Sequence, residues 1–476
     1  MARVRIPLGL SIGKGRSEAA GMASLTNMYA EPVENEGRTN VVCYGSPAKA
    51  LFASIGGGIV RGHITANDVE HVVVGTRLYS VTSGGATTDL GEIEGADPVD
   101  ISFNGTNIDI VAELKSYSYL PSSLTLSEIT DTDFEQASTC AGHNGRSVFG
   151  VKGTGRFRWS SLADSTTFDG LDYATAEAES DAIVALRKVG NELAILGSAT
   201  TEFWYDTGDI DNQYSRVAAP AADIGCVARD TALVVDSGLT WVGRDGKAGG
   251  VSVYRAEGYQ PKRISTPEVD GYLESVSDLS LLHALAYQQR GHLFYVLTNP
   301  DEFTLAWDVA TNQWAYRKSG LWSMGAEPSG GWDARTFAIN GTKQIVGAAD
   351  GNLYELQTDT YSENSQGIVR EATTTQIHRD GKRCFMSRLE LDIETNIALS
   401  SGQGSDPQIY ESHSDDGGNT WSTPRIAAVG QVGQNKYRCV WNALGSFRQR
   451  IIKFRGSDPV NWVFLGSWAD MTVGAH

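Results

Sequence analysis

The chain has 476 residues, with 39 Lys and Arg against 57 Asp and Glu, so its formal net charge is −18. Binding nucleic acid tightly needs a basic surface that neutralises phosphates, and this balance therefore argues against a protein whose main task is to grip DNA or RNA. The five cysteines stand singly and no CxxC spacing occurs, which excludes zinc ribbons and thioredoxin-like redox sites.

In chain order, residues 1–49 are expected to form an N-terminal arm. It carries Arg3 and Arg5 around a short apolar stretch, which is too short for the apolar region of a signal peptide. No run of about 18 apolar residues occurs anywhere in the sequence, so we expect no membrane insertion by this chain.

Residues 50–362 repeat one pattern: an apolar strand, a Gly-rich or polar turn, and a second strand that carries an aromatic residue. HVVVGTRLYSV (71–81) and ELAILGSATTEFWYD (192–206) are two examples. The second-strand aromatic residues are Tyr79, Tyr119, Trp159, Trp204, Trp241, Trp307 and Tyr354. Most of their spacings lie between 37 and 47 residues, the length of a four-stranded blade. We therefore expect an all-β propeller whose core these aromatic residues fill.

Seven such hairpins predict six or seven blades, because one hairpin can close the ring with strands from elsewhere, and six is preferred. One spacing, between Trp241 and Trp307, is 66 residues long. We attribute it to a helical insertion at about 267–285. Thr266 can cap that helix, and Pro267 suits its first position.

Residues 363–476 alternate apolar and polar side chains and predict a C-terminal β-rich region. Whether this region is a separate sandwich or joins the propeller rim stays open. It contains one S-x-D-x-G-x-T-W match, the Asp-box pattern, formed by Ser414, Asp416, Gly418, Thr420 and Trp421. Such a box is a structural hairpin turn: its carboxylate accepts backbone N–H bonds, Gly supplies the turn, and Trp packs beneath.

The Asp box is familiar from sialidases, so a sialidase-like or other carbohydrate-active propeller is one alternative function. A propeller that binds glycans or host receptors without chemistry is another. A sialidase also needs an arginine cluster and a tyrosine nucleophile with a nearby acid, and no such context is recognisable. GxxxxGK[ST], HExxH, GxSxG and EF-hand motifs are absent, and the eight histidines never stand at metal-ligand spacing. We therefore expect no enzyme, no metal site and no cofactor.

A basic stretch interrupts the acidic background. Residues 431–457 contain no Asp or Glu, and their basic residues are Lys436, Arg438, Arg448, Arg450, Lys453 and Arg455. Arg448, Arg450 and Lys453 are expected to extend from one side of a strand. The stretch is a solvated strand face, a contact to a sister subunit or partner, or a direct contact to DNA. Complementary charge sets register and specificity between proteins, which is the reason for the second alternative.

Several segments in order resemble the packaged-DNA stabilisation proteins, the tail hubs or nozzles of short-tailed bacteriophages. They include GRFRWSSLADSTTFDGLDYATAEAESDAIVAL (155–186), TTEFWYDTGDIDNQYSRV (200–217) and GHLFYVLTNPDEFTLAWDVATNQWAYR (291–317), within a resemblance that spans roughly 27–360.

This resemblance implies a six-bladed propeller in a virion tail, assembled in the bacterial host cytoplasm. It implies a homo-hexameric ring below the portal and its adaptor, which retains packaged DNA and carries distal parts such as a needle, spikes or fibres. DNA would pass through the channel of the ring without sequence recognition, and an acidic lumen would keep phosphates from sticking.

Overall fold

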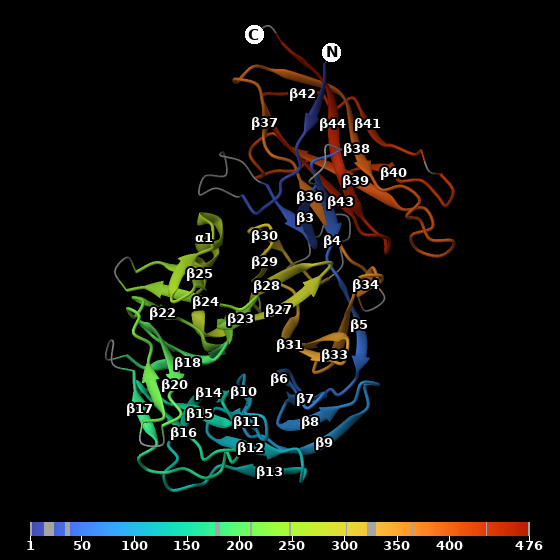
Figure 1. The fold of residues 1–476 in the computed structure, drawn as a ribbon. Helices are drawn as coiled ribbons and strands as arrows, with labels where there is room; N and C mark the ends of the chain where they lie inside the picture. The colour runs from blue at the N-terminus through green and yellow to red at the C-terminus, as the bar shows by residue number, and fades with distance from the viewer. Residues whose placement is uncertain are drawn as a thin grey trace.

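The computed structural model describes most of the chain, namely residues 2–13, 23–33, 39–176, 181–209, 212–246, 249–300, 302–320, 330–363, 366–434 and 436–474. Within these ranges the regular structure is almost entirely β-strand, as the sequence predicts. The strands form two parts, a lower one built from residues 48–357 and an upper one built from both ends of the chain (Figure 1).

The lower part consists, in the described residues, of seven groups of antiparallel strands that follow one another in sequence, here called units 1 to 7. Unit 1 holds β6 (Val60–Ala66), β7 (Val69–Val74), β8 (Arg77–Val81) and β9 (Thr87–Glu92). Unit 2 holds β10 (Asp100–Phe103), β11 (Ile108–Val111), β12 (Ser116–Leu120) and β13 (Thr125–Glu128). Unit 3 holds β14 (Ala137–His143), β15 (Arg146–Val151), β16 (Arg156–Trp159) and β17 (Tyr173–Thr175). Unit 4 holds β18 (Ile183–Val189), β19 (Glu192–Gly197), β20 (Thr201–Asp206) and β21 (Tyr214–Arg216).

The remaining three units vary this plan. Unit 5 holds β22 (Ile224–Cys226), β23 (Leu233–Val235), β24 (Gly238–Asp245), β25 (Val251–Glu257) and β26 (Gln260–Arg263). Unit 6 holds β27 (His283–Gln289), β28 (His292–Asn299), β29 (Phe303–Asp308) and β30 (Gln313–Tyr316). Unit 7 holds β31 (Ala334–Asn340), β32 (Lys343–Ala348), β33 (Leu353–Gln357) and, from the N-terminal side, β5 (Ala48–Ala53). β5 pairs antiparallel with β33, with Ala50 opposite Glu355.

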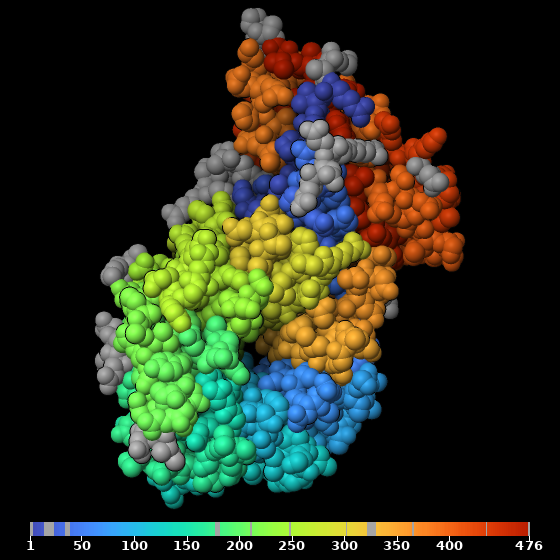
Figure 2. All heavy atoms as spheres, in the orientation of Figure 1, coloured from blue at the N-terminus to red at the C-terminus, as the bar shows by residue number. Residues whose placement is uncertain are grey.

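One strand of each unit, the first in every unit except unit 5, lies beside the corresponding strands of the neighbouring units. β6, β10, β14 and β18 contact each other in that order, β23 follows next to β18 and β27, and β31 contacts both β27 and β6. The order of contacts thus returns to unit 1. Figure 2 shows the units following one another in colour around a hollow on the face in view. Stacking of this kind buries the apolar faces that a single four-stranded sheet leaves open.

One α-helix, α1 (Pro267–Ser275), occurs in the described residues and lies between units 5 and 6, inside the range where the sequence predicts an insertion. The side chain of Thr266 caps it by accepting a hydrogen bond from the backbone N–H of Val269. Val269 and Leu273 are buried in the core shared by the two units. Short 3-10 turns stand nearby, η2 (Arg229–Thr231) and η3 (Leu279–Leu281).

The upper part has two main sheets around one core. The first joins β1 (Ala2–Ile6), β3 (Met28–Pro32), β4 (Val41–Gly45), β44 (Val463–Val473), β38 (Cys384–Ile393), β41 (Cys439–Asn442) and β42 (Ser446–Phe447). The second joins β2 (Leu25–Thr26), β36 (Arg370–Thr373), β43 (Gln449–Gly456), β39 (Gln408–Ser414), β40 (Arg425–Ala428) and β37 (Ile377–His378). A small pair, β34 (Ser362–Glu363) and β35 (Gln366–Gly367), links the two parts. Leu389 of the first sheet and Ile452 of the second belong to the shared core.

The two parts are joined by a continuous sheet. β2 pairs in parallel with β30 of unit 6 and antiparallel with β36 of the upper part. The N-terminal arm therefore does not hang free: β1, β3 and β4 complete the upper part and β5 completes unit 7. Ile12 of the arm is buried in the core of units 5 and 6.

Six of the seven aromatic residues expected in the propeller core are buried, and Tyr79 is half-buried. Trp241, however, lies in β24, the second strand across its sheet (β22-β24-β25-β26), whereas the other six lie in the third strand across theirs. Tyr254 in β25 occupies the equivalent place. Tyr254 stands 50 residues after Trp204 and 53 residues before Trp307. The 66-residue spacing therefore has two causes: the helix α1, and the use of Trp241, which lies in a different strand position from the other six aromatic residues. The attribution of the spacing to a helical insertion alone is incomplete.

Candidate functional site

The Asp box is a closed hairpin turn at the end of β39. Both Oδ atoms of Asp416 accept from the backbone N–H of Thr420 at 3.0 Å, and the hydroxyl of Ser414 donates to Oδ1 at 2.6 Å. The backbone N–H of Gly418, whose φ of 106° suits glycine, donates to the Ser414 hydroxyl at 2.8 Å. Hydrogen bonds from Ser414 and Thr420 hold the pKa of the Asp416 carboxyl well below its usual range. This carboxylate is engaged by its own loop.

Trp421, the last residue of the box, is half-buried and lies against a cation. The Lys453 ammonium stands 4.0 Å from the centre of its ring. Beside the box, Arg450 forms a two-pronged pair with Asp415, through Nε and Nη2 at 2.7 Å each. Arg450 is 2 % exposed and also donates to the carbonyl of Leu444. The box is therefore anchored to β43 by an ion pair in which Arg450 is buried and 43 % of the Asp415 side chain stays exposed.

Arg455 and Lys453 also direct their charges inward. Arg455 is 6 % exposed and donates through Nε to Oε2 of Glu371 at 2.8 Å. The Lys453 ammonium lies 3.7 Å from the other carboxylate oxygen of Glu371. Of the six basic residues expected at a subunit or partner interface, Arg450, Lys453 and Arg455 are thus neutralised within the chain. Arg450 and Lys453 are therefore not part of a solvated basic strand face, and the expectation that the six residues form a subunit or partner interface stays a prediction.

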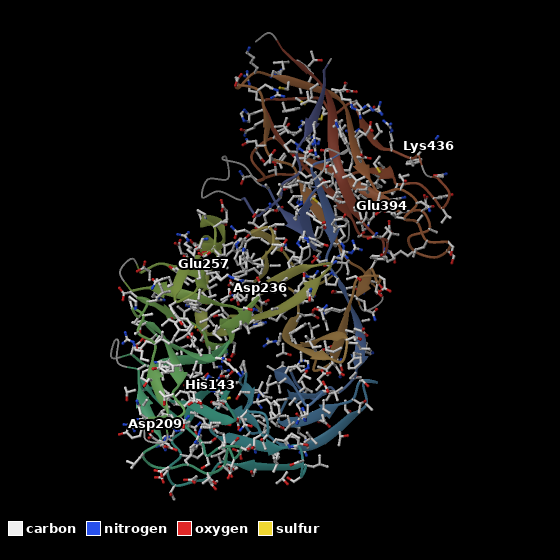
Figure 3. The ribbon with its side chains drawn as sticks, in the orientation of Figure 1. His143, Asp209, Asp236, Glu257, Glu394 and Lys436 are labelled. Atoms are coloured by element: carbon white, nitrogen blue, oxygen red, sulfur yellow. The ribbon has the colours of Figure 1, made fainter. Side chains whose placement is uncertain are left out.

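Lys436, Arg438 and Arg448 are the exposed members of the stretch. Arg438 donates to Glu390 Oε1 at 3.0 Å while 58 % of its side chain stays exposed. Arg448 donates to the carbonyl of Gly381. Lys436 lies on the outer side of the upper part, away from the propeller units (Figure 3). These three residues retain charge that another molecule could meet.

Sequence reasoning missed a buried ion-pair cluster where units 2 to 5 meet. Asp100 accepts from Arg187 Nη1 at 3.1 Å, and Arg187 also donates to the carbonyl of Ala232 at 2.7 Å. Arg229 reaches the carbonyl of Ser138 at 3.1 Å. Burial would raise the pKa of Asp100, but Arg187 and Arg229 beside it hold that pKa below its usual range. Each residue stands in a different repeat, so no local pattern could reveal the cluster.

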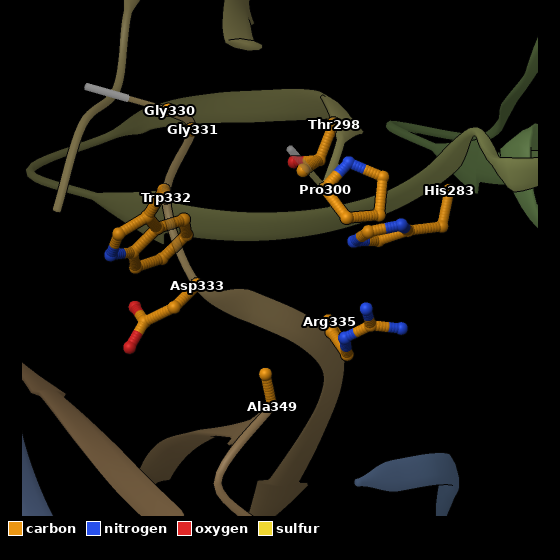
Figure 4. A pocket seen from close by; sticks show the side chains of 9 residues that line it. All are labelled: His283, Thr298, Pro300, Gly330, Gly331, Trp332, Asp333, Arg335 and Ala349. Carbon is orange, nitrogen blue, oxygen red and sulfur yellow. The ribbon is translucent and has the colours of Figure 1, made fainter. Parts of the chain in front are cut away.

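A cavity of about 380 Å³ opens between units 6 and 7 (Figure 4). His283 and Arg335 stand on one side of it and Trp332 and Asp333 on the other. Burial lowers the pKa of His283 to about 4, so its imidazole is neutral at pH 7.

In the part of the chain that the structure describes, no three His, Cys, Asp or Glu side chains gather as metal ligands would. The described helices are also too short and polar to span a membrane.

Charge is divided unevenly between the parts. Residues 50–362 hold 21 Lys and Arg against 41 Asp and Glu, a net charge of −20. Residues 363–476 hold 12 of each, and residues 1–49 hold 6 against 4. Exposed acids such as Asp209, Asp236 and Glu257 lie on the propeller units in Figure 3. The entire acidic excess of the chain therefore resides in the lower part.

Up-and-down four-stranded units in sequence, joined to a two-sheet upper part, define a β-propeller protein with an attached β-sandwich. Comparison with known families agrees for both parts. A family described as bacteriophage P22 Gp10, beta-propeller, matches residues 9–361, and one described as bacteriophage P22 Gp10, beta-sandwich, matches residues 369–472.

The chain belongs to this Gp10 family, the packaged-DNA stabilisation proteins of short-tailed phages. It is accordingly a structural component of a bacteriophage tail. The family match lends no support to the carbohydrate-active or glycan-binding alternative.

Solved structures show only distant likeness, and no curated relative matches the sequence. The computationally designed Ika8 protein is 15 % identical over 74 % of this chain and 99 % of its own, with a TM-score of 0.38. The N-terminal domain of Nup159 is 9 % identical over 70 % and 99 %, with a TM-score of 0.41. The Neurospora crassa Pan2 WD40 domain is 8 % identical over 65 % and 95 %, with a TM-score of 0.41. Similarity at this level says nothing of what the chain binds.

Proposed function

We propose that this protein is the tail hub, or nozzle, of a short-tailed phage. Six copies form a ring below the portal–adaptor assembly, retain the packaged genome, carry distal tail proteins and form the channel for genome ejection. The protein acts without catalysis or cofactors and assembles onto the virion in the bacterial cytoplasm. The single observation that carries this proposal is the Gp10-family match over both parts of the chain.

Within each subunit we propose a seven-bladed propeller rather than six blades. Seven units of described strands support the higher number, because one strand of each contacts those of its neighbours in an order that returns to unit 1. Closure of unit 7 by β5 supports a ring that is fastened between segments far apart in the sequence. Such a ring resists opening because unit 7 cannot come apart from the N-terminal segment without breaking the ladder between β5 and β33.

The charge distribution supports a channel role. A net charge of −20 on residues 50–362 repels DNA phosphates, so the genome can slide past the propellers without adhering. A ring of identical subunits is made from one repeated heterologous interface. Lys436, Arg438 and Arg448, exposed on the sandwich, are proposed to contribute to contacts with a sister subunit or the adaptor.

Imaging of the purified full chain, alone and mixed with its portal–adaptor assembly, tests the hub proposal. We expect six-fold rings with a central hole, accompanied by a hexamer mass in native mass spectrometry. A chain that stays monomeric in both samples would overturn the proposal. Particles with another rotational symmetry would retain a ring but refute the hexamer.

A further inference from the structure

Two buried arginines, here called the arginine pair, meet where the propeller joins the sandwich. Arg317 follows β30 of unit 6, and Arg370 is the first residue of β36 in the sandwich. Nη2 of Arg317 donates to the carbonyl of Pro47 at 3.1 Å. Nη2 of Arg370 donates to the carbonyl of Ser46 at 2.8 Å, and Gly45 makes room for it, because a Cβ there would stand 2.6 Å from Arg370 Nε. Since the two carbonyls belong to consecutive residues, the two guanidinium groups lie close together.

The arginine pair has more hydrogen-bond donors than the chain has acceptors for them. In the described part of the chain, Nε and Nη1 of Arg317 and Nη1 of Arg370 have no hydrogen-bond partner. The buried indole N–H of Trp332 has none either, and the Arg317 guanidinium lies 4.2 Å from the centre of its ring. Buried donors are almost always paired. Four unpaired donors at one junction therefore indicate a site for an acceptor from outside the chain.

The arginine pair also lacks direct counter-charges. Among the described residues, no carboxylate lies within 4.0 Å of either guanidinium. Asp333 is engaged by Lys49, and burial raises the pKa of Glu363 although Lys49 and both arginines oppose the rise. Burial, and then the charge of Arg317, lower the pKa of Arg370 to about 9, so its guanidinium is still charged at pH 7. A buried charge without a partner is costly, which favours binding of an anion.

A cavity of about 240 Å³ lies at the same junction. Lys49, Lys318 and Glu363 line it, and the exposed residues Gly320 and Gln366 open it to solvent. A water molecule takes about 30 Å³ in the liquid, so the cavity has room for an ion of several heavy atoms. Cations outnumber carboxylates here, namely Lys49, Lys318, Arg317 and Arg370 against Asp333 and Glu363.

We propose that this junction binds one small oxyanion of the phosphate type between the arginine pair and the lysines of the cavity. A guanidinium presents parallel N–H groups that match two oxygens of such an ion. The occupant is a free ion rather than a macromolecule, because both arginines are 2 % exposed and no partner surface can reach them. The bound ion fastens unit 6 and the segment before β5 to β36, and so holds the sandwich on the propeller. This property belongs to the single chain and is independent of the tail role proposed above.

Equilibrium dialysis of the full chain against radiolabelled inorganic phosphate, with NaCl holding the ionic strength constant, tests the site. We expect one phosphate per chain, displaced by sulfate but not by chloride. The melting temperature is expected to rise by about 5 °C at a hundredfold excess over Kd and then to level off, because the ion binds only the folded state. Absence of binding would overturn the proposal, as would a rise without saturation, which indicates an adventitious ion only.

A matched pair of variants locates the phosphate. R317Q/R370Q removes the two buried cations, and R379Q/K382Q removes two exposed cations from the sandwich. We expect phosphate affinity to fall at least about tenfold in the first variant and to stay at the parental value in the second. Equal affinities in the two variants would overturn the site.

Arg370→Lys provides the same test if R317Q/R370Q does not fold. The lysine keeps the positive charge but cannot present two parallel donors to one ion. We expect phosphate affinity to fall about tenfold in this variant while its far-ultraviolet circular dichroism stays parental. Parental affinity in Arg370→Lys would overturn the role of the arginine pair.

Discussion

Arg448 and Arg450 stand two residues apart, yet one is exposed and the other lies beneath the Asp-box loop. The difference is Asp415, which supplies both oxygens to the Arg450 guanidinium. Removing one partner of a buried pair leaves the other charge uncompensated, which costs more than the pair itself contributes. At the scale of single residues, buried charge is therefore where this chain is most sensitive to substitution.

Asp415→Asn is expected to destabilise the sandwich by about 2 kcal/mol, because Arg450 then remains buried without its counter-charge. Denaturant unfolding of the full chain measures this change. Asp359→Asn, at an exposed acid, is the control and is expected to change stability by less than about 0.5 kcal/mol. Equal effects of the two substitutions would show that the ion pair is unimportant.

Asp109 is a buried acid, as Arg450 is a buried base. It is fully buried, and burial raises the pKa of its carboxyl to about 7, although the hydroxyls of Ser147 and Ser165 counter part of the rise. The folded pKa lies above the unfolded one, so the stability that the protonated form contributes is fully present below about pH 4 and is lost as pH rises to about 7.

Asp109→Asn is expected to abolish this loss, since the amide stays neutral at every pH. Each pKa unit is worth about 1.4 kcal/mol, so the variant gains up to about 4 kcal/mol relative to the parent between pH 4 and 7. Melting temperatures of both proteins across that range test the expectation. Parallel pH profiles would contradict it.

Among the elements, α1 is an insertion between units 5 and 6 that packs into the core of these two units. Its cap, Thr266, and its first residue, Pro267, are local signals, whereas its position is fixed by Val269 and Leu273 in the core of units 5 and 6. Most helical stability in proteins comes from such packing rather than from propensity.

Leu273→Ala is expected to cost about 3 kcal/mol, because it removes a 1 % exposed side chain and leaves a cavity. Leu281→Ala nearby is the matched control, since Leu281 is 56 % exposed and its truncation is expected to be nearly neutral. Calorimetric or denaturant unfolding distinguishes the two. A neutral Leu273 variant would mean that α1 contributes nothing to the contact between the units.

For the whole molecule, the N-terminal arm ties the two ends of the chain together. β1 pairs with β44, the last strand, with Ala2 opposite Met471 and Ile6 opposite Ser467. β5 pairs with β33, and β2 joins unit 6 to the sandwich. Both parts of the protein are therefore complete only when the full chain has been made.

Hydrogen exchange tests this closure. The amides of β5 are expected to exchange as slowly as those of β31 and β32, because opening β5 breaks the ring and requires global unfolding. Peptides from the exposed turn at 379–383 serve as the fast-exchanging control. Rapid exchange in β5 with slow exchange in β31 would show that the ring stays intact without its N-terminal strand.

Features that depend on neighbouring residues could be predicted from the amino-acid sequence. Hairpin alternation with recurring aromatic residues indicated an all-β propeller, and Thr266 and Pro267 indicated the insertion. The bonds of the Asp box lie within eight residues, from Ser414 to Trp421, so its pattern alone specifies a turn.

Features that depend on residues far apart in the chain could be seen only in the folded protein. Arg450 meets Asp415 from 35 residues away, and β5 meets β33 across the whole propeller. A basic residue has the same identity whether it is exposed, as Arg448 is, or buried against a carboxylate, so local pattern could not separate them. Long-range strand pairing and burial fixed both the closure of the ring and the surface that remains free to bind.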